Sequence, residues 1–252
     1  MNIKISIITV TKNSEQYLSK TIESVIAQSY SNIEYIVIDG NSSDHTKEII
    51  KKYEDNIDVF ISEDDNGMYE AINKGLALSS GDYILVLNSD DMLADAHVIE
   101  KVVSFIEQSR LDWYYGNIIK LKGGKQFYTR LFNVNYKSLL MSTHGTFVPH
   151  PCFFISATLN KKLNGYQTQY KFASDYDYIL RALNTTNATG RHLNVYVTQF
   201  RIHTNSITAS GLINKERVQI LANHHYYEIP AISRLYSFYK LWIYYKIINL
   251  MP

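Results

Sequence analysis

The amino-acid sequence predicts an α/β fold with a Rossmann-like, mostly parallel central sheet flanked by helices. Continuous apolar runs recur along the first part of the chain, and such runs are typical of strands that are buried on both faces. Segments with apolar side chains at helical spacing lie between these runs. Strands and helices that alternate in this way form βαβ units, and right-handed crossovers place the helices on both faces of the sheet.

The N-terminal half supplies the predicted parallel strands. Residues 4–10 are β-branched and apolar, which favours a buried first strand. Asn13 and Gln16 have the spacing of a capping box, so the next helix is expected to begin at Glu15. Ser43 or Asp44 can cap the helix that follows the second strand. We expect strands at residues 4–10, 33–38, 58–62 and 83–87, and helices at residues 15–28, 44–53 and 68–79.

The pattern changes after Asp91. Residues 113–121 and 126–131 flank a Lys-Gly-Gly-Lys turn, which predicts a β-hairpin. Pro151 has no N–H to donate to a sheet, so residues 146–155 are expected to form an edge strand or an extended loop. Ser174 is expected to cap the next helix. The remaining predictions are helices at residues 95–108, 174–183, 215–227 and 232–250, and a strand at residues 193–201.

Composition and charge narrow the class of protein. The chain has 252 residues, of which 46% are hydrophobic and 19% charged, so it can bury a sizeable core. Its net charge of +1 gives no global field that would attract nucleic acid. The single cysteine, Cys152, excludes an intramolecular disulfide and fits a reducing compartment. The N-terminus lacks the pattern of a signal peptide, and no uncharged apolar stretch reaches the ~18 residues of a spanning helix.

No linker rich in proline or glycine divides the chain, so we expect one continuous domain followed by a helical segment. Residues 1–95 are expected to bind a nucleotide, and residues 96–210 to face an acceptor. Residues 211–252 form the expected C-terminal helical segment.

Two neighbouring carboxylates follow the apolar run at residues 83–87. Asp90 and Asp91 therefore fall at the carboxyl end of a buried strand, where ligands bind in open α/β sheets. Two adjacent carboxylates repel each other and are costly to desolvate unless a cation joins them. A hard divalent cation, Mg²⁺ or Mn²⁺, carrying a phosphorylated substrate fits this arrangement. A polar turn that ends the strand is the structural alternative.

A second acidic turn lies at residues 39–46 (DGNSSDHT). Asp39 can accept hydrogen bonds from a base or a ribose, and Gly40 permits close approach of the backbone. An ordinary loop between a strand and a capped helix has the same composition, so the local pattern leaves both interpretations open.

Four stretches taken together resemble the family 2 glycosyltransferases, the large inverting family with the glycosyltransferase A fold. Residues 6–13 (SIITVTKN) look like the opening of that family, and residues 39–46 look like its DGSSDGT loop, with His45 where glycine is usual. Residues 63–75 (EDDNGMYEAINKG) are similar to the donor-side segment of a bacterial polysaccharide branch. Residues 81–91 (GDYILVLNSDD) match the segment with the DxD motif, with Asn88 replacing the first Asp. The resemblance is strong over residues 1–95 and weaker, but collinear, to about residue 205.

The resemblance implies a nucleotide-sugar donor, with UDP favoured over GDP or dTDP, and Mg²⁺ or Mn²⁺ as cofactor. It also implies a glycan or lipid-linked acceptor and surface-polysaccharide assembly in the cytoplasm, at the inner face of the cytoplasmic membrane. Lys74 can assist near the phosphates, although an exposed helix lysine is the alternative. The donor residues expected from the resemblance are Thr9, Asn13, Asp39, Asn41, Asn73, Lys74, Asn88, Ser89 and Asp90, and the metal ligands are Asp90, Asp91 and His203.

Inverting transfer needs a base that takes a proton from the acceptor hydroxyl. Residues 172–181 (FASDYDYILR) resemble the family's (E/D)D-x-D-L-x-x-R stretch, which aligns Asp175 with the catalytic base. Ser174 replaces the usual preceding acid. Asp175 and Asp177 lie about 200° apart on a helix, so both cannot face one acceptor. Two weaker candidates are His150, for the acceptor pocket, and Arg201 with His203, for the diphosphate or the metal. A structural histidine with a hydrogen-bond partner explains either site equally well.

Residues 232–250 combine aromatic and aliphatic side chains with sparse cations, Lys240 and Lys246. This composition suits a helix that lies in a membrane interface, with Trp242 at headgroup depth. A helix packed on the core of its own domain, or on a second copy in a homo-oligomer, explains the pattern equally well.

Two rival functions remain at the level of sequence. A nucleotidyltransferase that makes the activated sugar usually carries a glycine-rich basic signature near the first strand, and residues 9–13 (TVTKN) are not one. A nucleotide-sugar-binding module without transfer activity would not need the full set of Asp39, Asp90, Asp91 and Asp175.

Overall fold

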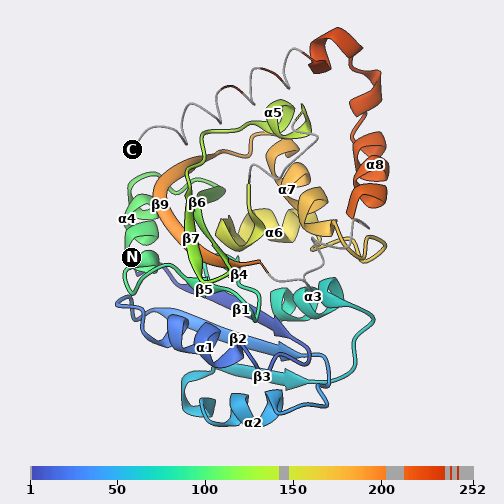
Figure 1. The fold of residues 1–252 in the computed structure, drawn as a ribbon. Coiled ribbons are helices and arrows are strands. Elements are labelled where there is room, and N and C mark those ends of the chain that lie inside the picture. The colour runs from blue at the N-terminus through green and yellow to red at the C-terminus, as the bar shows by residue number, and fades with distance from the viewer. Residues whose placement is uncertain (1, 142–147, 203–212, 236–238, 240–242, 244–252) are drawn as a thin grey trace.

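A nine-stranded sheet forms the centre of the molecule in the computed structural model, which describes residues 2–141, 148–202, 213–235, 239 and 243 (Figure 1). The strand order is β3-β2-β1-β4-β8-β6-β9-β5, and β7 pairs with β6 outside this path. The strands are β1 (Ile5–Thr11), β2 (Ile33–Asp39), β3 (Val59–Ser62), β4 (Tyr83–Val86), β5 (Met92–Leu93), β6 (Trp113–Lys122), β7 (Lys125–Thr129), β8 (Phe153–Ser156) and β9 (Gly190–Arg201).

The first four strands are parallel, as the sequence predicts. β1 lies between β2 and β4, and β2 also pairs with β3. Every residue of β1 and of β4 is buried, which explains why these strands have no polar alternation. The C-terminal half adds antiparallel pairs of β8 with β4 and β6, and a parallel pair of β6 with β9. The α/β class is confirmed, and the complete sheet is mixed.

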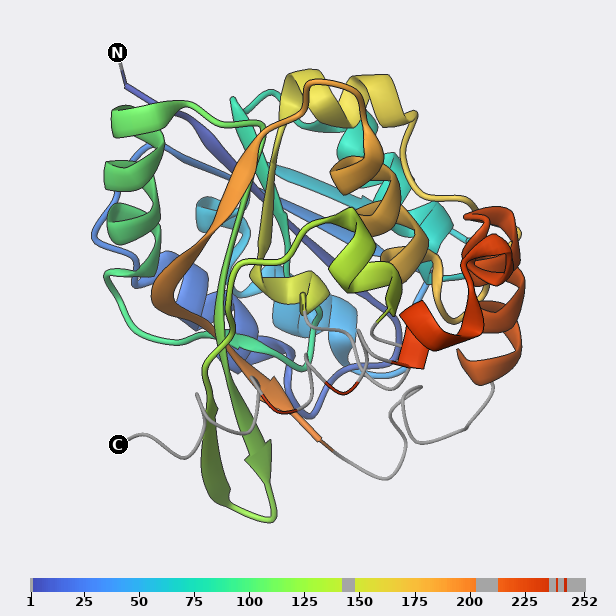
Figure 2. The same cartoon turned by 90° about the horizontal axis from the view of Figure 1, so that it is seen from above.

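Helices cover both faces of the sheet, as expected from right-handed crossovers (Figures 1 and 2). One hydrophobic core contains residues of α1, α2 and α4, and the other contains residues of α3 and α5–α8. The helices are α1 (Leu18–Ile26), α2 (Thr46–Lys51), α3 (Met68–Leu78), α4 (Val98–Ser109), α5 (Tyr136–Met141), α6 (Ala157–Leu163), α7 (Ser174–Asn184) and α8 (Ile213–Asn223), with 3₁₀ turns at Glu54–Asn56, His150–Cys152 and Tyr226–Glu228.

The three expected helix caps are wrong. At α2, His45 occupies the N-cap position in place of Ser43 or Asp44. The backbone of Asn13 is left-handed, with φ 51°, and its side-chain oxygen accepts from the N–H of Ser43 at 2.9 Å. Asn13 therefore connects two loops instead of capping α1, which begins at Leu18 rather than Glu15. Ser174 lies inside α7, because Ala173 occupies the N-cap position.

The expectation of an edge strand or loop around Pro151 is also wrong. Pro151 lies in a 3₁₀ turn at His150–Cys152, and β8 begins only at Phe153. Because the proline precedes the strand, every residue of β8 retains an N–H for pairing. β8 is therefore an interior strand between β4 and β6.

The predicted hairpin is confirmed. β6 and β7 pair in register from Ile118↔Thr129 to Lys122↔Lys125, and the ribbon extends beyond the body of the molecule (Figure 2). Gly123 and Gly124 have φ angles of 56° and 76°. A two-residue turn with positive φ at both positions favours glycine at each of them.

Only part of the expected helix at residues 232–250 is described. Residues 231–235, 239 and 243 are helical, and the others fall outside the described residues. Within the described part of the chain, no helix combines the length and the apolar character that crossing a membrane requires.

Candidate active site

The carboxyl ends of β2, β1 and β4 lie side by side at one edge of the sheet. Asp39 ends β2 and pairs with Thr11, the last residue of β1. The loops that leave β1 and β4 also meet, because the hydroxyl groups of Ser14 and Ser89 are 2.8 Å apart. Asp39 and the segment that contains Asp90 and Asp91 therefore lie at the same edge of the sheet, at the carboxyl ends of the parallel strands.

Asp39 is fully buried. Its carboxylate accepts hydrogen bonds from the N–H of Ser42 at 3.0 Å and from the hydroxyl of Ser62 at 2.6 Å. A Cβ at Gly40 would lie 2.4 Å from the carboxylate of Asp65, so any larger residue would make the Asp65 side chain move. The carboxylate of Asp39 thus shapes the loop, and the approach of a nucleoside to the backbone at Gly40 stays a prediction.

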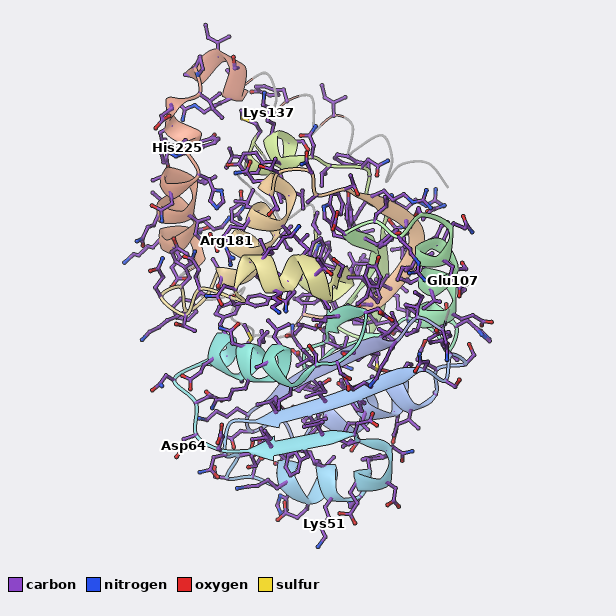
Figure 3. The ribbon with its side chains drawn as sticks, turned by 180° about the vertical axis from the view of Figure 1, so that it is seen from behind. Lys51, Asp64, Glu107, Lys137, Arg181 and His225 are labelled. Carbon is purple, nitrogen blue, oxygen red and sulfur yellow. The ribbon has the colours of Figure 1, made fainter. Side chains whose placement is uncertain are left out.

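Asn41 joins the same loop to its surroundings. Its backbone is left-handed, with φ 56°, a conformation that asparagine tolerates better than most residues. Its side chain donates to Asp64 at 3.2 Å and accepts from Lys47 at 2.9 Å. Asp64 lies on the loop that leaves β3 (Figure 3) and Lys47 lies in α2, so Asn41 joins its own loop to a second loop and to a helix.

Asp90 and Asp91 have different surroundings. Asp91 is fully buried, and its carboxylate accepts from the backbone N–H of Arg201 at 3.0 Å and from the amide of Asn88 at 3.3 Å. Burial, reinforced by the negative charge of Asp90, raises the pKa of Asp91 well above its usual range. Asp90 is only half-buried, and its carbonyl oxygen accepts from the guanidinium of Arg201 at 3.2 Å. Solvent therefore reaches Asp90 more readily than Asp91.

The donor atoms around these carboxylates suit a hard cation. The side-chain oxygen of Asn88 is buried and has no hydrogen-bond partner among the described residues. Carboxylate and amide oxygens are the ligands that Mg²⁺ and Mn²⁺ prefer. The described residues contain no ready-made group of three His, Cys, Asp or Glu side chains, and His203 falls outside them. Asp90, Asp91 and the oxygen of Asn88 are accordingly the residues here that could hold the ion.

Arg201 ends β9 beside this segment. In addition to its contact with the carbonyl of Asp90, its guanidinium lies 4.5 Å from the centre of the Tyr17 ring. β9 thus places the positively charged side chain of Arg201 beside the loop after β4, although the two are far apart in sequence.

Three residues expected at the donor have structural partners. Thr9 is fully buried and accepts from the hydroxyl of Tyr35 at 3.2 Å, so it lies inside the core and not at the edge of the sheet. Asn73 makes two hydrogen bonds of 2.8 Å with the backbone of Tyr166, which tie α3 to the loop before α7. Lys74 forms an ion pair with Glu63 at 3.0 Å, which favours the structural interpretation of this lysine.

Asp175 lies in the first turn of α7, on the side of α3. The hydroxyl of Tyr69, from α3, donates to its carboxylate at 3.3 Å. Tyr69 follows the loop that leaves the carboxyl end of β3, so this contact directs Asp175 toward the same side of the sheet as Asp39. Asp175 is half-buried and thus accessible.

Asp177 points elsewhere, as helical geometry predicts. It is buried and pairs with Arg181 at 2.7 Å and with His224 at 3.3 Å. Burial pushes the pKa of Asp177 upward, but the hydrogen bond from His224 and the charge of Arg181 outweigh it and hold the pKa below its usual range. Figure 3 shows Arg181 on α7, on the opposite side of α3 from the loop of Asp64. Asp177 therefore serves the packing of α7.

His150 lies at a buried position near Asp175. Its ring nitrogen Nε2 is 2.7 Å from the hydroxyl of Tyr166, and only 7% of the residue is exposed. Burial lowers the pKa of His150, although the negative charge of Asp175 opposes this effect. His150 is thus a buried histidine whose ring nitrogen has a hydrogen-bond partner in the core.

Two residues near Asp175 were not expected from the sequence. Tyr69 was expected only as part of the donor-side stretch at residues 63–75, with no contact to Asp175, and Glu216 of α8 accepts hydrogen bonds from the backbone just before α7. No local pattern marks either residue, because each contacts α7 across a long separation in sequence.

Comparison with known proteins agrees with this geometry. Residues 6–166 match the sequence profile of Glycosyl transferase family 2. An uncharacterized glycosyltransferase of Mycobacterium tuberculosis is 32% identical over 188 residues, which are 71% of this chain and 68% of the relative.

Two solved structures that contain nucleotide-sugars have the same fold. S. aureus TarS 1–349 in complex with UDP-GlcNAc superposes with a TM-score of 0.75 at 17% identity, over 95% of this chain and 71% of that one. The mannosyltransferase PcManGT from Pyrobaculum calidifontis, in complex with GDP-Man and Mn²⁺, gives a TM-score of 0.67 at 13% identity, over 99% of this chain and 71% of that one. The matched profile spans the acidic loops at the ends of β2 and β4, and the chain belongs to glycosyl transferase family 2.

Proposed function

We propose that this glycosyltransferase is an inverting, metal-dependent enzyme that transfers a sugar from a nucleotide-sugar to a glycan or lipid-linked acceptor in surface-polysaccharide biosynthesis. The observation that carries the proposal is the arrangement of carboxylates. Asp39, Asp90 and Asp91 gather at the carboxyl ends of β2 and β4, and Asp175 approaches from α7 on the same side. UDP is the favoured nucleotide, and GDP and dTDP are the alternatives. The complexes of TarS with UDP-GlcNAc and of PcManGT with GDP-Man and Mn²⁺ support such a donor and cation.

In the proposed reaction, the acceptor oxygen forms a bond to the anomeric carbon of the donor sugar. The bond from that carbon to the diphosphate breaks, and its electron pair leaves with the nucleoside diphosphate. Asp175 accepts the proton of the attacking hydroxyl. Attack from the face opposite the leaving group inverts the anomeric centre.

Asp90 and Asp91, with the amide oxygen of Asn88, would hold Mg²⁺ or Mn²⁺. The bound cation supplies stabilisation of the negative charge that develops on the diphosphate. Asp39 and Asn41 belong to the loop at the end of β2, which is where a nucleoside would be contacted. Asn13 contacts this loop from the end of β1.

Assays of donor turnover test the proposal. The full chain is incubated with UDP-GlcNAc, GDP-mannose or a dTDP-sugar, with Mn²⁺ or with EDTA, and the release of nucleoside diphosphate is followed. We expect release with at least one donor, and its loss in EDTA. Binding of a donor without any turnover would favour the binding-module alternative. Release of pyrophosphate from a nucleoside triphosphate and a sugar phosphate would identify a nucleotidyltransferase instead.

We also propose that the C-terminal segment, residues 232–250, contacts a membrane interface. Ile232, Leu235, Tyr239 and Ile243 are exposed by 85%, 59%, 54% and 50%, and they recur at the spacing of one helix face. Apolar side chains on one helix face favour partition into the headgroup region. A second copy of the chain is the alternative partner for the same face.

A further inference from the structure

Asp175 receives a hydrogen bond from a tyrosine that is fixed in the core. Tyr69 is 3% exposed, and its hydroxyl lies 3.3 Å from Oδ1 of Asp175. Burial, together with the negative charge of Asp175, raises the pKa of Tyr69 well above its usual range. The phenol therefore stays protonated and donates a hydrogen bond to the carboxylate oxygen.

Aromatic stacking restricts the position of this hydroxyl. The rings of Tyr69 and Tyr166 are stacked, with centroids 5.7 Å apart and planes at 13°. Tyr166 is stacked in turn on Tyr178, with centroids 4.1 Å apart. The stack connects α3 to α7, so the hydroxyl of Tyr69 is held in a defined place relative to the helix that carries Asp175.

A second contact fixes the backbone just before Asp175. The carboxylate of Glu216, on α8, accepts hydrogen bonds from three consecutive N–H groups, those of Lys171 at 2.7 Å, Phe172 at 2.7 Å and Ala173 at 2.9 Å. Ala173, at the N-cap position of α7, makes no capping hydrogen bond through its own side chain. A carboxylate bound by several N–H groups is a strong, charge-assisted contact. Glu216 thus holds the segment that sets the start of α7, two residues before Asp175.

We propose that Tyr69 and Glu216 are positioning residues for the catalytic base, and that helix α8 thereby completes the active site. This inference rests on the proposed role of Asp175. Tyr69 fixes one carboxylate oxygen of Asp175, which leaves the other oxygen to take the proton of the acceptor. Glu216 fixes the backbone from which that carboxylate projects. Both contacts direct the base toward the side of the sheet where the donor is proposed to bind.

The substitution Tyr69→Phe tests the first contact. It removes only the hydroxyl and keeps the ring stacked on Tyr166. With UDP-GlcNAc or GDP-mannose and Mn²⁺, whichever the wild type hydrolyses, we expect kcat to fall about 10-fold because a hydrogen bond to a charged group is lost. The KM for the donor and the affinity for the free nucleotide should not change. Tyr178→Phe is the matched control, since it removes a hydroxyl of the same stack that bonds to Asn160 and not to Asp175.

The substitution Glu216→Gln tests the second contact. The amide of glutamine has one acceptor oxygen, and its NH₂ group cannot accept a hydrogen bond from the remaining backbone N–H groups. The backbone before α7 is therefore held less firmly. We expect kcat to fall by about 10-fold or more at unchanged nucleotide affinity, and Glu216→Asp to recover part of the rate. Glu228→Gln is the control, because Glu228 is exposed and its carboxylate forms a local contact with His225 at 2.7 Å.

Combination with Asp175→Asn separates the failure of this inference from that of the proposed function. If Asp175 is the base and the other residues position it, Tyr69→Phe should have little further effect in the Asp175→Asn background. A wild-type rate for Asp175→Asn would overturn the proposed function itself. A slow Asp175→Asn enzyme with wild-type kcat in both Tyr69→Phe and Glu216→Gln would overturn only the positioning roles. An equal loss in Tyr178→Phe would assign the effect of Tyr69 to packing and overturn its positioning role.

Discussion

Asp90 and Asp91 are adjacent in sequence but differ in what surrounds them. Asp91 is buried and bonded to the backbone of β9, whereas Asp90 is half-buried. The sequence left open which of them binds the cation. We propose that Asp90 would bind the cation from its more exposed position, and that the buried Asp91 would contribute a second oxygen while it joins the loop after β4 to Arg201.

The substitution Asp90→Asn should weaken Mn²⁺-dependent binding of the nucleotide without changing the fold. Loss of a ligand should reduce the affinity for the metal complex by at least about 10-fold, as changes even in the outer shell of metal sites do. Calorimetric titration of UDP or GDP, with Mn²⁺ and with EDTA, measures the effect. Asp55→Asn changes the net charge equally at an exposed 3₁₀ turn and serves as the control. Equal Mn²⁺-dependent affinity in wild type and Asp90→Asn would exclude Asp90 as a ligand.

Asp175→Asn and Asp177→Asn should separate catalysis from stability. Asparagine at residue 175 keeps the size of the side chain but cannot accept the proton, so the transfer rate should fall at least ~100-fold at normal donor affinity. Asp177→Asn breaks the buried contacts with Arg181 and His224, so it should lower the melting temperature and affect the rate much less. Single-turnover rates and thermal melts measure both effects. A dead Asp177→Asn enzyme beside an active Asp175→Asn enzyme would show that the alignment of this helix is wrong.

At the scale of secondary-structure elements, the parallel strands followed directly from the sequence because their signal is local. A buried strand such as β4 is aromatic or aliphatic at every position, whatever its neighbours are. The position of β8 in the sheet was predicted wrongly. A proline excludes an interior strand only when it lies within the paired residues, and Pro151 lies just before them. α6 was missed, although Ser156 caps it by accepting from the N–H of Leu159 at 3.2 Å, because the helix has only seven residues.

The same distinction applies to the candidate site. The acidic loops after β2 and β4 could be predicted because each is a continuous stretch of sequence. The contact of Tyr69 with Asp175 joins residues 106 positions apart, so it depends on how α3 and α7 pack. Thr9 was expected at the donor, but the alternation of β1 turns it toward Tyr35 in the core.

Glu34 connects three elements near the amino ends of the strands. Its buried carboxylate accepts hydrogen bonds from the N–H of Ser80 at 2.7 Å and from Lys4 at 2.9 Å, in addition to the hydroxyl of Ser6. Burial raises its pKa, but these hydrogen bonds outweigh burial and lower the pKa from about 4.5 to about 2. A carboxyl whose pKa is lower in the folded state stabilises the fold above its unfolded pKa, and this contribution is lost as the pH falls toward 2.

The substitution Glu34→Gln should therefore make the stability of the fold depend less on pH at acid pH. We expect a lower melting temperature than that of the wild type at pH 7, and a difference that shrinks between about pH 4.5 and about pH 2. Thermal melts over this range measure the effect, and Glu54→Gln at an exposed turn is the control. A difference between wild type and Glu34→Gln that stays constant with pH would contradict the role of the ionised carboxylate.

At the scale of the whole molecule, the C-terminal part of the chain contains one helix that packs on the core and a following segment that is exposed. The inner side of α8 packs into the core through Ile220 and Leu221, and Glu216 reaches α7. The segment that follows exposes Ile232 and Leu235 instead. Ile232 and Leu235 therefore form an exposed apolar face outside the buried core. An exposed apolar face of this kind suits a partner outside the chain.

Paired substitutions in the full chain test the membrane as that partner. Ile232→Glu together with Leu235→Glu places two charges on residues that are 85% and 59% exposed, so the melting temperature should not change. Removing two apolar side chains from an interface should lower the binding to anionic vesicles by at least about 10-fold, since each buried side chain contributes about 1.5–3 kcal/mol. Co-sedimentation with vesicles of phosphatidylglycerol and phosphatidylethanolamine measures the binding. Phe127→Glu, which changes an apolar residue of the β7 strand that is 51% exposed, is the matched control. If the wild type ignores these vesicles and sediments as a dimer that the double substitution dissociates, the face binds a second copy of the chain and the membrane proposal is wrong.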